Sequence, residues 1–159
     1  MSLNEEVDLL RSIPLFAKIE PSKLKLLAFT SERLTFAADQ ILFNQGDIGD
    51  SAYVIVSGSA DVLIDTPNGP IRVAAVGKNA FVGEIAILCD VPRTATIKAT
   101  EQLDTLKISK DLFFRLVTEF PSMAVEIMRE LAARLEATNG QLREANAEVK
   151  RLQDAADAS

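Results

Sequence analysis

One short segment combines a glycine, a carboxylate and a guanidinium in a way that suits a phosphate ester. Residues 81–96 contain Gly83, Glu84 and Arg93. Gly83 precedes an apolar stretch that can form a helical turn, whose first N–H groups lack internal partners and favour an anion. Arg93 can hold a phosphate through paired hydrogen bonds, each worth roughly 1.5–3 kcal/mol. Glu84 can accept from a hydroxyl, so the set fits a phosphate beside a free ribose hydroxyl.

Two other readings of these residues concern structure and catalysis. From residue types alone, a structural ion pair between Glu84 and Arg93 competes with the ligand reading. The chain has no histidine, which is the commonest metal ligand and general base. This argues against histidine-based triads and against a metal-dependent jelly-roll enzyme of the cupin type. We therefore expect a binding protein that is not an enzyme and has no metal or cofactor.

Overall composition bears on partners and location. The formal net charge of −6, from 17 basic and 23 acidic side chains, does not provide the clustered basic face that nucleic acids require. No apolar run is long enough to cross a bilayer, and no leader-like start is present. We expect a cytoplasmic protein that binds neither nucleic acid nor membrane. The single cysteine, Cys89, is predicted to be a small buried residue and not a reactive thiol.

The elements that must position the segment are short strands between turns. Apolar residues at helical spacing predict two opening helices, at residues 4–11 and 21–28. The period then changes, and residues rich in Gly, Pro, Asn and Asp separate short apolar runs. These runs cover residues 34–36, 41–43, 52–56, 60–64, 71–75, 95–99 and 103–108. The pattern predicts a mainly β fold, a double-stranded β-helix or jelly-roll barrel with flanking helices.

Helical spacing returns in the C-terminal part. Ser109 is a predicted N-cap for a helix at residues 111–119, and a second helix is predicted at 122–153. We therefore divide the chain into residues 1–120, a β-barrel with N-terminal helices, and residues 121–159, a C-terminal lid or dimerisation helix and tail. Asn139 and Gly140 lie in the middle of this helix and could kink it.

The second helix carries a heptad pattern. Its seam positions alternate by four and three residues: Ala124, Met128, Leu131, Leu135, Thr138, Leu142, Ala145, Val149 and Leu152. Such a seam requires a partner helix, which predicts a homodimer through the C-terminal helix. The alternative is that the first half packs on its own barrel and the rest is a solvated tail.

Several stretches resemble a known family. Residues 83–86, Gly-Glu-Ile-Ala, followed by residues 92–95, Pro-Arg-Thr-Ala, look like the phosphate-binding cassette of cyclic-nucleotide-binding domains. This family includes the catabolite activator protein, kinase regulatory subunits and cyclic-nucleotide-gated channels. Residues 44–58 are similar to its glycine-marked turn and strand, and residues 10–16 resemble its lead-in. The resemblance reaches about Gly140 and implies a regulatory module that binds cAMP or cGMP.

The resemblance also implies roles for individual residues. Glu84 would accept a hydrogen bond from the ribose 2′-hydroxyl, and Arg93 would clamp the cyclic phosphate. The backbone N–H groups of Ala86 and Ala95 would complete the phosphate cradle. Gly83 would permit the close approach of the backbone.

Ile85 and Thr94 belong to the same predicted ligand-binding set. Thr94 follows the arginine, where the family has Ala, Ser or Thr. Its hydroxyl could reach the phosphate, and in cGMP-binding relatives a threonine here is associated with the amino group of guanine. The choice between cAMP and cGMP therefore stays open, as does a plain strand-filling role for Thr94.

The C-terminal helix is the predicted reporter. In the catabolite activator group, polar residues on this helix contact the adenine, which makes Thr138 and Asn139 candidate base contacts. That group continues into a helix-turn-helix DNA-binding domain, whereas this sequence ends at Ser159. We expect either a missing output domain or a stand-alone module that signals by dimer rearrangement or to a separate protein. The alternative function is an effector-blind structural dimerisation domain, against which the intact Glu84 and Arg93 argue.

Overall fold

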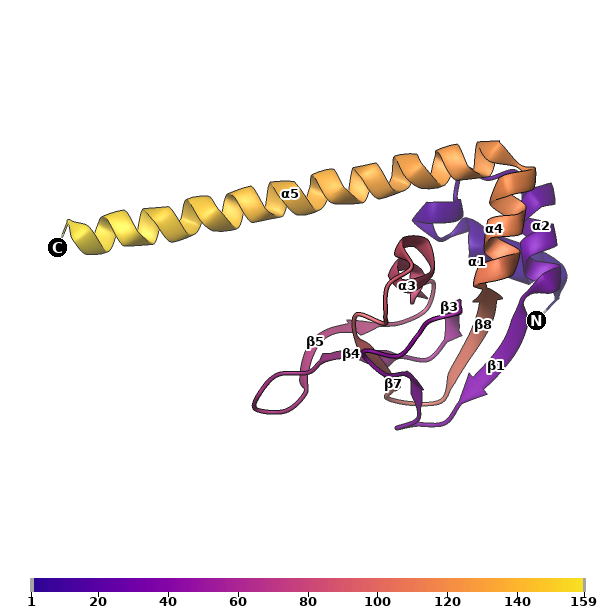
Figure 1. Cartoon of the computed structure of the whole chain (residues 1–159), viewed down its shortest axis with the longest axis horizontal. Helices are drawn as coiled ribbons and strands as arrows, with labels where there is room; N and C mark the ends of the chain where they lie inside the picture. The colour runs from indigo at the N-terminus through magenta and orange to yellow at the C-terminus, as the bar shows by residue number, and fades with distance from the viewer. Residues whose placement is uncertain (1, 159) are drawn as a thin grey trace.

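Two antiparallel sheets form the body of the protein (Figure 1). The computed structural model describes residues 2–158, apart from the side chains of residues 130 and 134. One sheet has the strand order β1-β8-β3-β6 and the other β2-β7-β4-β5. The strands are β1 (Glu32–Phe36), β2 (Ile41–Phe43), β3 (Ser51–Ser57), β4 (Ala60–Ile64), β5 (Ile71–Val76), β6 (Phe81–Val82), β7 (Thr96–Ala99) and β8 (Leu103–Ser109). The predicted jelly-roll fold with flanking helices is confirmed.

The burial of each strand follows its place in a sheet. β3 pairs with both β6 and β8, and its residues from Ser51 to Val56 are all buried. β5 is at the edge of its sheet and is mostly exposed, although all its residues except Arg72 are apolar. Sequence reasoning missed β6, because a strand of two residues has too few positions to show alternation.

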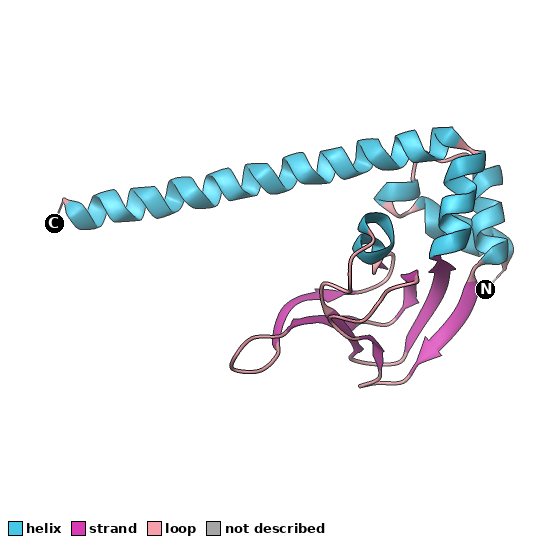
Figure 2. Cartoon of the chain, viewed as in Figure 1, coloured by secondary structure: helices cyan, strands magenta, loops and turns pink. Residues whose placement is uncertain are grey.

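Helices gather at one end of the sheets (Figure 2). They are α1 (Leu3–Arg11), the short 3₁₀ helix η1 (Pro14–Phe16), α2 (Pro21–Thr30) and α4 (Lys110–Glu119). Ser109 caps α4, as predicted, because its hydroxyl oxygen accepts from the Leu112 N–H at 3.2 Å. Fully buried side chains on these helices, such as Leu10, Phe16 and Leu24, form one core with Val54 of β3.

The last helix, α5 (Pro121–Asp157), has 37 residues and is roughly 55 Å long. It begins at Pro121, one residue before the predicted start, because the ring of proline suits the first turn of a helix. The helix continues through Asn139 and Gly140, where the sequence allowed a kink. Its first turns are anchored by Met123 and Ile127, which are buried in the core of the helical end.

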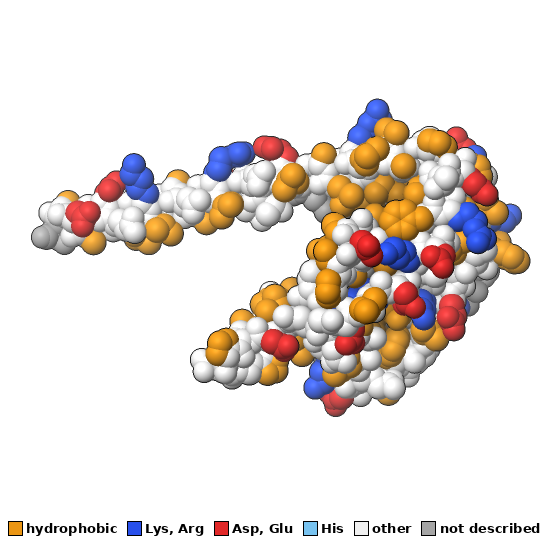
Figure 3. Space-filling model, in the orientation of Figure 1, with side chains coloured by type: hydrophobic (Ala, Val, Ile, Leu, Met, Phe, Trp, Pro, Cys, Tyr) orange, Lys and Arg blue, Asp and Glu red, His pale blue; other side chains and the backbone are white. Residues whose placement is uncertain are grey.

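Beyond its anchored part, α5 projects away from the body and leaves apolar side chains in solvent. Figure 3 shows these side chains along one edge of the projecting arm, with charged side chains along the other. The exposed large side chains are those at predicted seam positions: Met128, Leu135, Leu142, Val149 and Leu152. We call this row the α5 seam. These five side chains are exposed among the described residues, so the pattern that predicts a partner helix is present on the folded surface.

Candidate functional site

A tight turn and a short helix bring the predicted binding segment to one place. Gly83 follows β6 with φ +83° and ψ 5°, and the helix α3 (Glu84–Cys89) starts directly after it. This left-handed conformation favours glycine. A Cβ on Gly83 would lie 2.5 Å from Nη1 of Arg93, so the glycine also makes room for that guanidinium.

The end of α3 corrects one expectation. Cys89 is exposed, whereas we predicted a buried residue. Ala86 and Ile87 are the buried residues of α3, whereas Cys89 is its last residue and lies at the exposed end. Asp90 then ends the helix with φ 54° and makes an ion pair with Lys110, with 2.8 Å between Oδ1 and Nζ.

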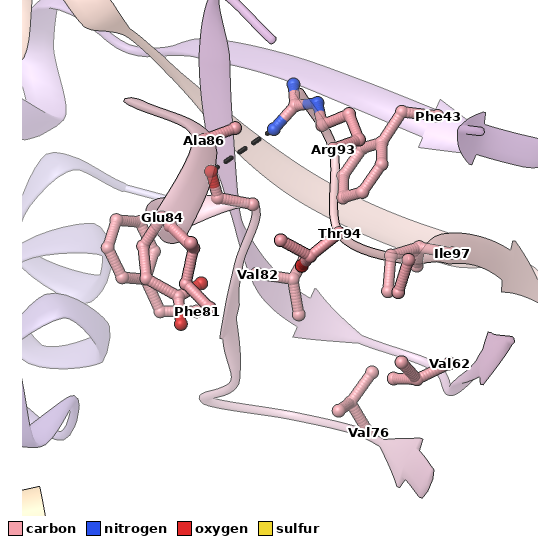
Figure 4. Close-up of a pocket in the computed structure, with 13 residues that line it drawn as sticks. Phe43, Val62, Val76, Phe81, Val82, Glu84, Ala86, Arg93, Thr94 and Ile97 are labelled. Atoms are coloured by element: carbon pink, nitrogen blue, oxygen red, sulfur yellow. Dashed lines mark hydrogen bonds between the residues drawn. The ribbon is translucent and has the colours of Figure 1, made fainter. Parts of the chain in front are cut away.

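The segment lines a cavity of about 230 Å³ between the two sheets and α3 (Figure 4). All seven residues that the sequence picks from this segment line it: Gly83, Glu84, Ile85, Ala86, Arg93, Thr94 and Ala95. The remaining lining is apolar, from Phe43, Val62, Val76, Phe81, Val82 and Ile97. The cavity thus has a polar side, from α3 and the loop that follows it, and an apolar side from the strands. This combination suits a small ligand with one charged and one flat apolar part.

Arg93 is the buried charge of this cavity, with only 5% of its surface exposed. Its Nη1 donates to the carbonyl oxygen of Gly83 at 3.2 Å. Its Nε is buried and has no hydrogen-bond partner among the described residues. Burial lowers the pKa of Arg93 from its usual value, and the nearby Tyr53, Asp50 and Asp47 oppose that shift. Because the normal pKa of arginine is so high, the guanidinium stays charged and requires an acceptor.

The loop before β3 holds the backbone of Arg93 in place. The Gly46 N–H donates to the carbonyl oxygen of Arg93, and the Arg93 N–H donates to that of Asp47, both at 2.8 Å. A Cβ on Gly49 would lie 2.7 Å from Cζ of Arg93 and 2.8 Å from Cβ of Ala86. Sequence reasoning found this loop by its resemblance to the family but did not assign Gly49 or Phe43 to the site. The sequence signal for this loop was its pair of glycines, Gly46 and Gly49, which stand three residues apart.

Glu84 and Arg93 lie on different sides of the site. Figure 4 shows the Glu84 carboxylate well apart from the guanidinium of Arg93. Glu84 is half-buried and lines the cavity, while Ile85 and Thr94 line it from exposed positions. A ligand that spans the distance between the carboxylate and the guanidinium can therefore contact both.

Thr138 and Asn139 lie elsewhere. Both are exposed on the projecting part of α5, and neither belongs to the lining of the cavity. Their predicted contact with a base stays a prediction. Among residues 2–158, no cluster of three or more His, Cys, Asp or Glu side chains is arranged to hold a metal ion.

Comparison with known proteins assigns the chain to a family. The family model described as the cyclic nucleotide-binding domain matches residues 33–120, which is more than half of the chain. The chain belongs to the cyclic nucleotide-binding domain family. The resemblance inferred from residues 83–86 and 92–95 is thereby confirmed.

Relatives of this cyclic nucleotide-binding domain occur in several kinds of regulatory protein. A cAMP-dependent protein kinase regulatory subunit from Blastocladiella emersonii is 34% identical over 109 residues, which is 68% of this chain and 27% of that protein. The N-terminal domain of a transcriptional regulator from Streptomyces coelicolor is 31% identical, with a TM-score of 0.75 over 85% of this chain and 95% of that one. The Thermus thermophilus catabolite activator protein is 25% identical, with a TM-score of 0.73 over 84% and 63%.

The domain is one part of most of these proteins. The chain spans about a quarter of the kinase regulatory subunit and 8% of a lysophospholipase from Phaeosphaeria nodorum. The activities of these relatives therefore involve regions that this chain does not match. No helix within residues 2–158 has the length and apolar character needed to span a membrane.

Proposed function

We propose that this domain binds cAMP or cGMP in the cavity between α3 and the two sheets and acts as a regulatory module without catalytic activity. The observation that carries the proposal is Arg93, a buried cation with an unpartnered Nε in a cavity of about 230 Å³. A buried donor without an acceptor is costly, and a phosphate in the cavity would supply one. The direct test is saturable binding of either nucleotide by the purified chain.

The positions of the lining residues support a role for each part of the ligand. Arg93 is the phosphate clamp, and the backbone N–H groups of Ala86 and Ala95 complete the cradle. Glu84 accepts a hydrogen bond from the ribose 2′-hydroxyl at the other side of the cavity. The base would lie against the apolar strand residues, among them Val62 and Val76.

The choice of base depends on a position next to the clamp. Thr94 is exposed and lines the cavity, so its hydroxyl is available to a ligand. The kinase relative is a cAMP-dependent regulatory subunit, which favours cAMP. A guanine amino group could use the same hydroxyl, so cGMP is the second candidate.

Changing Glu84 to glutamine tests the ribose contact. We expect Glu84→Gln to weaken binding of cAMP by about 10-fold, because a hydrogen bond to a charged group contributes roughly 1.5–3 kcal/mol. The matched ligand is 2′-deoxy-cAMP, which lacks the hydroxyl and should bind both proteins with similar affinity. Calorimetric titration of the two proteins with the two ligands measures this. Equal losses for both ligands would contradict the assigned contact.

We also propose that the chain forms a homodimer whose arrangement depends on whether the cavity holds a nucleotide. The α5 seam supports this. Its five exposed apolar side chains repeat at heptad spacing over the projecting part of the helix. Pairing with the same helix of a second copy would bury them. Ligand would then favour the arrangement that brings α5, with Thr138 and Asn139, toward the base, since a ligand shifts an equilibrium only through differential affinity. The formal charge of −6 supports an output to protein and not to nucleic acid.

A lysine in the seam should separate the dimer. We expect Leu142→Lys to shift the sedimenting species toward the 17.3 kDa of one chain, because it places a charge in an apolar interface. Ala147→Lys, at an exposed position of α5 outside the seam, is the matched control and should sediment like the wild type. Analytical ultracentrifugation over a range of concentrations measures this. A wild-type chain that stays monomeric throughout would refute the dimer.

A further inference from the structure

We propose that Phe43 is a positioning residue for Arg93, and that its ring holds the guanidinium ready for phosphate before any ligand arrives. This inference rests on the proposed function, because it assigns Arg93 as the phosphate clamp. The side chain of Phe43 reaches the cavity from β2, whereas Arg93 lies in the loop before β7. Two segments far apart in the sequence therefore meet at this contact.

The contact is a stacking of a cation on an aromatic face. Cζ of Arg93 lies 4.0 Å from the centroid of the Phe43 ring. Figure 4 shows the two side chains next to each other at one end of the cavity. A guanidinium over an aromatic face is attracted by the negative charge of the π system, and the attraction is larger when water is excluded, as it is at 5% exposure.

The backbone at two glycines also lies close to the guanidinium. At Gly49 and at Gly83, an added Cβ would lie only 2.7 Å and 2.5 Å from guanidinium atoms. The hydrogen bond from Nη1 to the Gly83 carbonyl oxygen fixes one edge, and Nε keeps a free donor. Together with the ring, these contacts limit the orientations of the planar group. Such preorganisation reduces the entropy that ligand binding has to overcome.

The ring of Phe43 is itself held by other aromatic side chains. It stacks on Tyr53 with centroids 6.0 Å apart and an angle of 29° between the planes. Tyr53 is 7% exposed and lies in the central strand β3, and Phe36 of β1 meets it edge-on at 6.1 Å. The column of Phe36, Tyr53 and Phe43 crosses from one sheet to the other. Of these rings only Tyr53 stacks directly on Phe43, so Tyr53 is the side chain that fixes the orientation of the Phe43 ring.

The experiment observes Arg93 directly in the ligand-free protein. The Nε–H signal of Arg93 is recorded by NMR and identified by its loss in Arg93→Lys. In Phe43→Leu, which keeps an apolar side chain but has no aromatic face, we expect its exchange with solvent to speed up by about 3- to 30-fold. Phe43→Tyr should restore the wild-type rate to within about twofold. Phe36→Leu, which removes a ring of the same column that does not touch Arg93, is the matched control and should leave the signal unchanged.

Nucleotide affinity supplies the functional readout. We expect Phe43→Leu to weaken binding by about 3- to 30-fold, Phe43→Tyr to bind like the wild type, and Phe36→Leu to stay within about twofold. An unchanged Arg93 signal in Phe43→Leu, or equal effects of Phe43→Leu and Phe36→Leu, would overturn the inference. The NMR comparison needs no ligand, so a wild-type chain that binds no nucleotide would refute the proposed function and still leave the positioning role testable.

Discussion

Replacing Arg93 with alanine is expected to raise the Kd for the cyclic nucleotide by at least about 100-fold. Two hydrogen bonds from a guanidinium to a phosphate together contribute roughly 3–6 kcal/mol, which corresponds to about two to four powers of ten in affinity. Arg93→Lys should recover part of the loss, because lysine keeps the charge but lacks the planar pair of donors. Calorimetric titration of the three proteins with cAMP and cGMP measures the effect.

The control for Arg93→Ala is a change of the same charge outside the cavity. Arg72 on β5 is 65% exposed and lies 3.7 Å from Asp61, so Arg72→Ala should leave the affinity unchanged. The melting temperature of Arg93→Ala should stay close to that of the wild type, since the change removes a buried charge whose Nε has no partner. An Arg93→Ala protein that binds as tightly as the wild type would exclude Arg93 as the clamp.

The second large effect is expected from one methyl group at Gly49. A Cβ there would lie 2.7 Å from Cζ of Arg93, which is too close for a real contact, so the guanidinium must move. We expect Gly49→Ala to weaken binding by about 10-fold or more and to destabilise the fold by roughly 1–3 kcal/mol through overpacking. Affinity is measured by calorimetry, and stability by urea unfolding.

Gly77→Ala is the matched control for this change. A Cβ on Gly77 would meet its nearest neighbour, the Gly58 carbonyl oxygen, at 3.7 Å, which is an ordinary contact. Neither Gly49 nor Gly77 has the positive φ that would strain an alanine. Gly77→Ala should therefore bind nucleotide like the wild type. Similar affinities for both alanine variants would mean that the packing around the guanidinium does not control binding.

Most of the fold could be predicted because every strand except β6 leaves a local pattern. The strands alternate or run apolar between turn residues, and the buried run of β3 is the clearest case. α5 follows its heptads from Pro121 onward, and Gly140 does not interrupt it, because a long helix tolerates one glycine at a cost of about 1 kcal/mol. Edge strand β5 was also found, although it is mostly exposed, because all its residues except Arg72 are apolar.

The site could be predicted only in part. Gly83, Glu84 and Arg93 are close in sequence, so their motif is readable and they line one cavity in the structure. Phe43 and Gly49 act through contacts between distant segments, which no local pattern contains. The burial of Cys89 was predicted wrongly, since the residue type favours the interior while its place at the end of α3 decides its exposure.

The central claim is tested most directly by calorimetric titration of the purified wild-type chain with cAMP and, separately, with cGMP. We predict saturable heat with one site per chain for at least one of the two nucleotides, and none with Arg93→Ala under the same conditions. The stronger of the two ligands identifies the preferred base. Absence of both binding heat and thermal stabilisation with either nucleotide would contradict the account and leave a structural dimerisation domain of the same fold.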